Sequence, residues 1–184
     1  MRKVIAAINI SLDGFCDQTI GIVNAELHNH YTELIKNAGV LLYGRTTYQM
    51  MESYWPKLVK NPSGEQSSDD FALAIDNIQK VVFSHTLKHV AWKNTTLAAR
   101  SLKEEVLALR QQPGSDIFAG SPGLIDQLTA LNLIDEYQLC IHPVIAGSGL
   151  PLFKHVSGTI ELKLLKTKTF STGAMINWYQ PAKR

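Results

Sequence analysis

The stretch that most constrains the fold runs from Asp116 to Phe153, D-I-F-A-G-S-P-G-L-I-D-Q-L-T-A-L-N-L-I-D-E-Y-Q-L-C-I-H-P-V-I-A-G-S-G-L-P-L-F. Within it, the run from Ile117 to Ala119 is apolar and bounded by breakers, which is typical of a short buried strand. Gly120 allows a tight turn, while Ser121 and Pro122 suit the N-cap and the first position of a helix. The stretch therefore predicts a strand, a glycine turn, a helix, a second strand and a second glycine turn.

The helix predicted after Gly120 has one apolar face, formed by Leu124, Ile125, Leu128 and Leu131. A strand that turns directly into a helix directs backbone N–H groups and the positive end of the helix dipole at one place, which suits a phosphate. An ordinary strand-to-helix turn is an equally good interpretation, because a glycine turn before a helix is a weak signal.

Strand and helix patterns alternate along the rest of the chain. Short apolar runs predict strands at Lys3–Ile10, Val40–Tyr43, Lys80–Phe83 and Thr95–Ala99. Periodic apolar residues and capping residues predict helices from Asn24 to a stop at Gly39, from Thr46 onward, from Asp69 to Asn77 and from Ser101 to about Gln112. Proline and glycine among polar residues predict a loop from Tyr54 to Ser68.

Two late apolar segments, Ile160–Phe170 and Ala174–Tyr179, flank a Ser-Thr-Gly turn and predict an antiparallel hairpin. Alternating strands and helices followed by such a hairpin indicate an α/β fold with a mostly parallel sheet. The length of 184 residues fits a single domain spanning residues 1–184.

The composition excludes several classes of function. A formal net charge of +2 is too small to favour nucleic acid or an anionic membrane as a partner. No apolar run approaches the roughly 20 residues of a transmembrane helix. Cys16 and Cys140 lack metal-ligand spacing, and His28 and His30 stand two residues apart on a helix, where they do not face each other. We therefore expect a cytoplasmic protein without a metal site.

A second candidate phosphate site lies at Gly44, Arg45 and Thr46, where a predicted strand meets a predicted helix. Gly39 to Thr46 nearly matches a P-loop, but its intervening residues form a strand rather than a glycine-rich loop, so nucleotide triphosphate hydrolysis is rejected. Helix N–H groups, the Thr46 hydroxyl and the Arg45 guanidinium suit the phosphates of a dinucleotide. The alternative is that Arg45 is an ordinary surface cation.

Four blocks, in this order, carry a family resemblance. They are I-S-L-D-G at Ile10–Gly14, L-Y-G-R-T-T-Y at Leu42–Tyr48, V-V-F-S-H-T-L at Val81–Leu87 and H-P-V-I-A-G-S-G-L-P-L-F at His142–Phe153. The chain resembles the dihydrofolate reductase-like superfamily, and most of all the branch that contains the reductase domain of riboflavin biosynthesis. This resemblance implies a three-layer α/β/α domain with a central mixed, mostly parallel sheet.

The resemblance also implies NADPH as the cofactor. The residues that it assigns to cofactor binding are Ala6, Ala7, Gly44, Arg45, Thr46, Ser84, His85, Gly120, Ser121, Pro122, Gly123 and Leu124. Many relatives have arginine in place of His85, which leaves the balance between NADPH and NADH open.

Asp13 is the expected catalytic acid, because it follows the first central strand and riboflavin-type relatives carry the same S-L-D-G. The alternative is that Asp13 only forms a turn with Gly14. Tyr48 and Trp55, with Asp13, are expected to face the substrate.

The resemblance implies an NADPH-dependent reductase acting on a small heterocyclic, carbonyl or imine substrate, similar to 5-amino-6-(5-phosphoribosylamino)uracil reductase. It also implies a homodimer joined through the late strands. A non-catalytic NADP(H)-binding or sensor protein on the same fold is the alternative.

Overall fold

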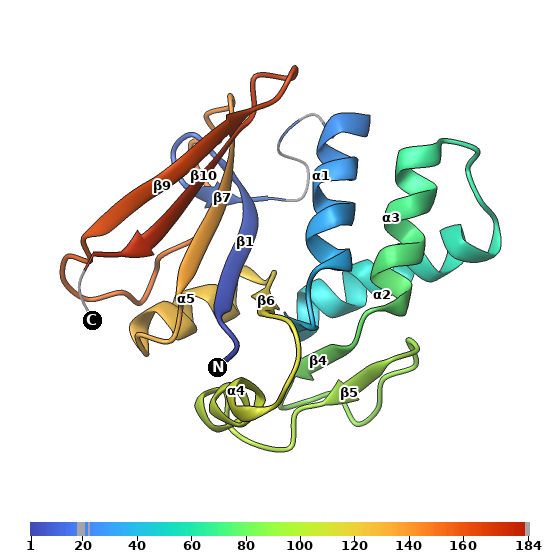
Figure 1. Ribbon diagram of the computed structural model, residues 1–184, viewed down its shortest axis with the longest axis horizontal. Helices are drawn as coiled ribbons and strands as arrows, with labels where there is room; N and C mark the ends of the chain where they lie inside the picture. The colour runs from blue at the N-terminus through green and yellow to red at the C-terminus, as the bar shows by residue number, and fades with distance from the viewer. Residues whose placement is uncertain (18–20, 22, 183–184) are drawn as a thin grey trace. The chain divides into compact units, whose positions relative to one another are not determined.

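The structure is a computed structural model that describes residues 1–17, 21 and 23–182 (Figure 1). The strands in this part of the chain are β1 (Val4–Ser11), β2 (Phe15–Cys16), β3 (Val40–Gly44), β4 (Lys80–Phe83), β5 (Thr95–Leu97), β6 (Ile117–Ala119), β7 (Glu136–His142), β8 (Leu150–Pro151), β9 (Leu162–Thr169) and β10 (Met175–Pro181). The helices are α1 (Ala25–Lys36), α2 (Arg45–Lys60), α3 (Gln66–Asn77), α4 (Leu102–Gln111) and α5 (Pro122–Ala130).

Eight of these strands form one sheet in the order β5-β4-β3-β6-β1-β7-β10-β9. β4 pairs in parallel with β3 and with β5, and β1 pairs in parallel with β7. At the end of the chain, β10 pairs antiparallel with both β7 and β9. The predicted α/β fold, with a mostly parallel mixed sheet and a terminal antiparallel hairpin, is confirmed.

The chain divides into two compact units. The first consists of Met1–Arg2 and Val23–Phe118, and the second of Lys3–Ile22 and Ala119–Arg184. The expectation of a single domain spanning residues 1–184 stays a prediction.

In the first unit, α1 and α3 lie side by side (Figure 1). The Asn24 side chain caps α1 by accepting a hydrogen bond of 3.0 Å from the Leu27 N–H, as the sequence predicts. The Ser101 and Glu104 side chains form the predicted capping box at the start of α4. Apolar side chains from several elements fill the core, among them Leu27, Leu42, Ile75, Val82 and Val106.

The predicted loop from Tyr54 to Ser68 is wrong over most of its length. Helix α2 continues through Pro56 to Lys60, so a short connection at 61–65 is all that separates it from α3. A proline inside a helix removes one backbone hydrogen bond, but packing overrides this cost. Trp55 packs on Phe71 of α3 with ring centroids 4.5 Å apart, and Leu58 is buried.

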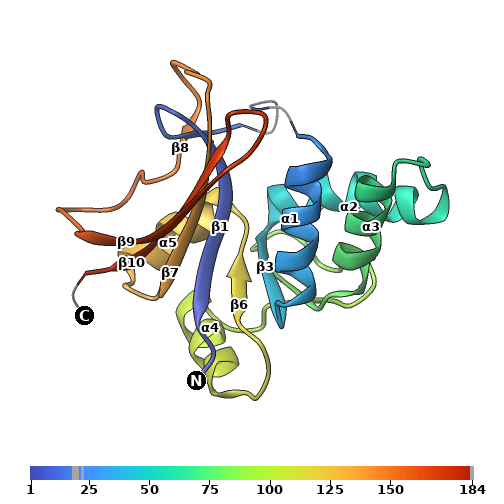
Figure 2. The ribbon, with the colours of Figure 1, turned by 45° about the horizontal axis from the view of Figure 1, so that its top comes forward.

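In the second unit, β1 and β7 run in register, with Ala7 opposite Gln138 and Ser11 opposite His142. Figure 2 shows β7, β10 and β9 following one another as a twisted antiparallel group. Helix α5 is tied to β7 by a hydrogen bond of 3.1 Å from the Tyr137 hydroxyl to Thr129 Oγ1.

The predicted apolar face of α5 is buried at Leu124, Ile125 and Leu128, but Leu131 is 41% exposed. Leu131 is the C-cap residue, beyond the last full turn, which explains why its side chain leaves the core. The structure also contains, over the described residues, no helix with the length and apolar character needed to cross a membrane.

Candidate functional site

The turn from β3 into α2 is the first element of the site. Gly44 is the N-cap of α2, its backbone is extended, and no side chain caps the helix start. The first turn of α2 holds no acidic residue, while Arg45 and Thr46 are exposed there. Neither a side-chain cap nor an acidic residue of the first turn therefore compensates the positive end of the helix dipole, which is the arrangement that suits a phosphate.

Thr86 joins this turn to the segment that follows β4. Arg45 Nη1 donates a hydrogen bond of 2.8 Å to Thr86 Oγ1. The Ser84 hydroxyl oxygen accepts hydrogen bonds from the N–H groups of Thr86, at 3.1 Å, and Leu87, at 3.0 Å. The predicted residues Arg45 and Ser84 thus belong to one constellation through Thr86, a link that the sequence interpretation missed although Thr86 lies inside a recognised block.

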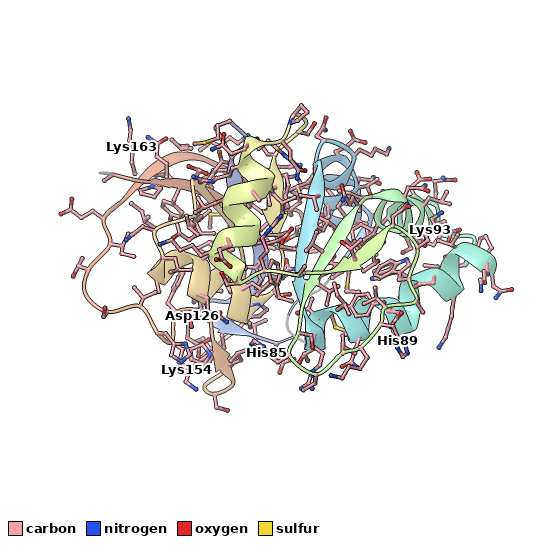
Figure 3. The ribbon with its side chains drawn as sticks, turned by 90° about the horizontal axis from the view of Figure 1, so that it is seen from below. His85, His89, Lys93, Asp126, Lys154 and Lys163 are labelled. Atoms are coloured by element: carbon pink, nitrogen blue, oxygen red, sulfur yellow. The ribbon has the colours of Figure 1, made fainter. Side chains whose placement is uncertain are left out.

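His85 stands between Ser84 and Thr86 and is exposed. It lies on the segment that follows β4 (Figure 3). Because β3 and β4 are parallel and Gly44 is opposite Phe83, the ends of the two strands bring Arg45 and the Ser84–Thr86 segment together. The first unit therefore presents a cation, hydroxyl groups and a helix start in one place.

The start of α5 is the phosphate-competent turn of the second unit. Ser121 is the N-cap, but it is only 3% exposed and its side chain makes no capping hydrogen bond. The first turn again lacks an acidic residue. Gly123 is exposed, and a Cβ added there would meet nothing within 4 Å, so the approach to the helix start is open. Leu124 is buried and its N–H donates to the Ser121 carbonyl at 3.1 Å, so the predicted contact of Leu124 with the cofactor has no donor left for a phosphate.

Ala6 and Ala7 lie in the middle of β1. Ala6 is fully buried, whereas Ala7 is partly exposed. Of this pair, Ala7 is therefore the residue with surface for a ligand.

Asp13 lies in the turn after β1 and bridges to a loop 133 residues further along the chain. Its Oδ1 accepts a hydrogen bond of 3.0 Å from the Ala146 N–H, and its Oδ2 accepts one of 2.8 Å from the Gly147 N–H. Hydrogen bonds from the Ser11 side chain and from these two N–H groups lower the pKa of the Asp13 carboxyl to about 2. Asp13 is thus ionised at neutral pH and has no proton ready to donate.

Further contacts join the same two loops. The Leu12 N–H donates to the Val144 carbonyl at 2.8 Å, and the Leu152 N–H donates to the Gly14 carbonyl at 3.1 Å. The short strands β2 and β8 also pair with each other. The S-L-D-G and H-P-V-I-A-G-S-G-L-P-L-F blocks therefore form one connected structure.

Tyr48 does not face a substrate, contrary to the expectation from sequence. Its side chain is 1% exposed, and its hydroxyl donates to Glu52 at 2.5 Å. The hydroxyl oxygen also accepts from the N–H groups of Ala91 and Trp92, both at 3.2 Å. Burial, followed by the Glu52 contact, raises the pKa of Tyr48. Tyr48 therefore anchors the segment before β5. Trp55 is half-buried on α2, and its contact with substrate stays a prediction.

His142, at the end of β7, is a buried polar residue that the sequence interpretation missed. Its side chain is 1% exposed, and Nε2 lies 3.1 Å from Asn9 Oδ1. Burial lowers the pKa of His142, so the ring is neutral at physiological pH. The available signal was a histidine inside the apolar run before Pro143.

Metal ligands do not cluster in the part of the chain that the structure describes: no group of three or more His, Cys, Asp or Glu side chains is placed to hold an ion. His28 instead stacks on Phe71, with ring centroids 5.8 Å apart, and its Nδ1 lies 3.2 Å from the Ser68 hydroxyl. This histidine is part of the packing between α1 and α3.

Comparison with known proteins identifies the family. Residues 2–176 match the model of the RibD C-terminal domain. The chain is 32% identical over 178 residues to the uncharacterized protein YyaP of Bacillus subtilis (strain 168), covering 95% of this chain and 92% of YyaP.

Two solved structures have the same fold. A candidate riboflavin biosynthesis protein from Shewanella sp. PV-4 is 18% identical, with a TM-score of 0.74 over all of both chains. A diaminohydroxyphosphoribosylaminopyrimidine deaminase/5-amino-6-(5-phosphoribosylamino)uracil reductase from Thermotoga maritima is 17% identical, with a TM-score of 0.67 over 98% of this chain and 57% of that one. By the match to nearly its whole length, the chain belongs to the RibD C-terminal domain family.

Proposed function

We propose that the protein is an NADPH-dependent reductase that delivers a hydride to a C=N or C=O group of a small heterocyclic or carbonyl compound. The observation that carries the proposal is the β3–α2 turn, where Arg45 is held to Thr86 beside an uncapped helix start. A phosphate is the ligand that such a turn favours. Membership of a family whose relatives include a uracil-type reductase supports the choice of reaction.

The first unit carries the cofactor site under this proposal, and the second unit has a candidate phosphate site of its own. In the first, Arg45 and Thr46 hold a phosphate, while Ser84 and His85 contact the 2′-phosphate. In the second, the Gly120–Gly123 turn at the start of α5 is a candidate phosphate site, and Ala7 has surface for a ligand. NADPH supplies the hydride when it is bound.

The proton that accompanies the hydride needs a source other than an un-ionised Asp13. Because its pKa is lowered to about 2, the Asp13 carboxyl is ionised at neutral pH. It could accept or relay a proton, but it holds no proton of its own to donate to the substrate. The catalytic part of Asp13 is therefore proposed as a relay between solvent and substrate.

A second candidate function is a non-catalytic NADP(H)-binding or sensor protein. The observation that favours it is that both oxygens of Asp13 are occupied by backbone N–H groups. Turnover separates the two functions, because a sensor binds the cofactor without oxidising it.

Cofactor binding is tested by calorimetric titration of NADPH. Loss of the Arg45 guanidinium in Arg45→Gln should weaken binding by roughly 10- to 100-fold, the range of a hydrogen bond to a charged group. Arg100→Gln is the matched control, because Arg100 is also in the first unit and its ion pair is with Glu105. Equal affinities for the wild type and Arg45→Gln would remove the β3–α2 turn from the cofactor site.

A further inference from the structure

The two loops joined by Asp13 carry almost no charge. We call them the loop pair, residues 11–16 and 143–153. Asp13 is the one charged side chain in these two described segments. The other titratable group is the Cys16 thiol, and burial raises its pKa to about 11, so it stays neutral.

The negative charge of Asp13 is already used inside the loop pair. Its two oxygens accept from the N–H groups of Ala146 and Gly147, which are donors that an anionic ligand would otherwise need. A phosphate at the loop pair would find the Ala146 and Gly147 N–H groups already bonded to Asp13. The negative carboxylate would also repel it. The loop pair is therefore unfavourable for an anion.

Apolar side chains are exposed on the same loop pair. Ile145 is 74% exposed, and the other exposed large apolar residues are Leu12, Val144, Leu150 and Phe153. The backbone contact from Leu12 to Val144 keeps the two segments together. Several exposed apolar side chains gathered on two joined segments, rather than a single one, mark a binding surface.

The position of the loop pair favours a small ligand over a second protein chain. It follows the carboxyl ends of β1 and β7, which are parallel. Ligands of α/β sheets bind beyond the carboxyl ends of their strands. A subunit contact has a different candidate surface, the edge strand β9, whose eight residues are all exposed.

We propose that the loop pair receives an uncharged, ring-containing substrate and selects against one that carries a phosphate. The substrate of the related reductase, by its name, is a phosphoribosyl compound, so the selectivity of this chain is different. This inference rests on the proposed reductase function, which supplies the reason for a substrate at this place.

Lys154 is the alternative phosphate ligand, because it follows the loop pair directly. It is exposed, and Figure 3 shows it in the second unit together with Asp126 of α5. The neighbouring His155 is already engaged, since its Nδ1 lies 2.5 Å from Asp126 Oδ2 and its N–H donates to Asp126 Oδ1 at 3.0 Å. His155 is thus committed to Asp126, and the Lys154 variant tests whether Lys154 binds a phosphate.

The first test uses Nile red, an uncharged ring-containing dye, and the full-length protein. Ile145→Asn should weaken dye binding by roughly 10-fold, the effect of losing one buried aliphatic side chain. Leu107→Asn is the matched control, because Leu107 is an exposed leucine on α4 outside the loop pair and outside β9, and it should bind the dye as the wild type does. Lys154→Ala and added inorganic phosphate should leave the affinity unchanged.

Three results would overturn the proposal in this test: equal losses in Ile145→Asn and Leu107→Asn, displacement of the dye by inorganic phosphate, or conversion of a dimer into a monomer by Ile145→Asn. The last would assign the apolar side chains to a subunit contact. None of these results depends on NADPH, so a failure of cofactor binding is seen separately in the Arg45 titration.

The second test compares 5-amino-6-(5-phosphoribosylamino)uracil with its dephosphorylated form by calorimetry. The dephosphorylated compound should bind at least as tightly, and Asp13→Asn should improve binding of the phosphorylated compound by removing the repelling charge. Binding of the phosphorylated compound that is 10-fold tighter and is lost in Lys154→Ala would contradict the proposal. If neither compound binds, the dye series decides.

Discussion

At the scale of single residues, the sequence predicted exposure and burial correctly for some candidate site residues and not for others. Arg45 is exposed at a helix start, as predicted. Asp13, expected as the catalytic acid, also clamps a loop, and Tyr48, expected to face the substrate, is buried. Their partners lie 133 and 43 residues away, so no local pattern could reveal them.

Removing the Asp13 clamp should free the Ala146–Gly147 backbone. In Asp13→Ala, the amide protons of Ala146 and Gly147 lose their acceptors, so their hydrogen exchange should accelerate by at least about 10-fold. Asp13→Asn keeps one acceptor oxygen and should give an intermediate rate. Asp70→Ala, which removes a partly exposed carboxylate in the first unit, is the control. Unchanged exchange at both amides would mean that the clamp is not formed in solution.

His85 should set the preference for NADPH over NADH. A phosphate contact is a charge-assisted hydrogen bond when a cation donates it, so His85→Arg should raise the ratio of the two affinities and His85→Ala should lower it by roughly 10-fold. His89 lies further along the same exposed segment (Figure 3), and His89→Ala serves as the control. Titrations of both cofactors measure the ratio. The same ratio in all three variants would assign the 2′-phosphate to another group.

Lys80 gives the protein a distinct dependence of stability on pH. Its Nζ donates to the carbonyl oxygens of Ile75 at 2.8 Å and Ile78 at 2.8 Å, under the ring of Trp92. Burial lowers the pKa of Lys80 from 10.5 to about 8. Between these values the unfolded chain binds more protons than the folded one, so the free energy of unfolding rises with pH. This gain in the free energy of unfolding from Lys80 is complete above about pH 10.5, and it is lost as the pH falls through about 8.

Urea unfolding of the wild type and Lys80→Met between about pH 7.5 and 9.5 isolates this contribution. The difference in unfolding free energy between the two proteins should grow in favour of the wild type as the pH rises. A constant difference would show that the pKa of Lys80 is the same in the folded and unfolded chains.

At the scale of elements, capping residues and apolar runs were sufficient to predict a helix or strand wherever the local preference of the residues agrees with their packing in the fold. Strand β4 and the capping box of α4 were found at the predicted residues. The sequence interpretation ended helix α2 too early because Pro56 is a strong local helix breaker. The compensating contact between Trp55 and Phe71 forms only when the chain has folded. Local reasoning fails where a tertiary contact outweighs a residue preference.

The edge strand β9 should form the contact of a homodimer. It lies at the end of the sheet, and its exposed leucines are Leu162, Leu164 and Leu165. An exposed edge strand presents unpaired backbone N–H and C=O groups with which another chain can pair. Light scattering at micromolar concentration should give the dimer mass, and Leu164→Lys should shift the protein toward the monomer. A monomer mass for the wild type would refute the homodimer.

At the scale of the whole molecule, the alternation of strands and helices predicted a mostly parallel sheet with an antiparallel end, and the strand order confirms it. The division into two compact units was not predictable, because both the first strand and the late strands belong to the second unit although they are far apart in sequence. The two phosphate-competent turns fall in different units, at the starts of α2 and α5. The chemistry of each turn follows from its own few residues.

Transfer of deuterium from NADPH tests the central claim most directly. The wild-type protein is incubated with NADPH deuterated at C4 of the nicotinamide and with a panel of uncharged C=N and C=O compounds, and the products are analysed by mass spectrometry. The account predicts one product that gains a deuterium at the former C=N or C=O carbon, with matching formation of NADP⁺, and much slower transfer in Arg45→Gln at the same NADPH concentration. Tight NADPH binding without deuterium in any product would contradict the reductase and favour the sensor.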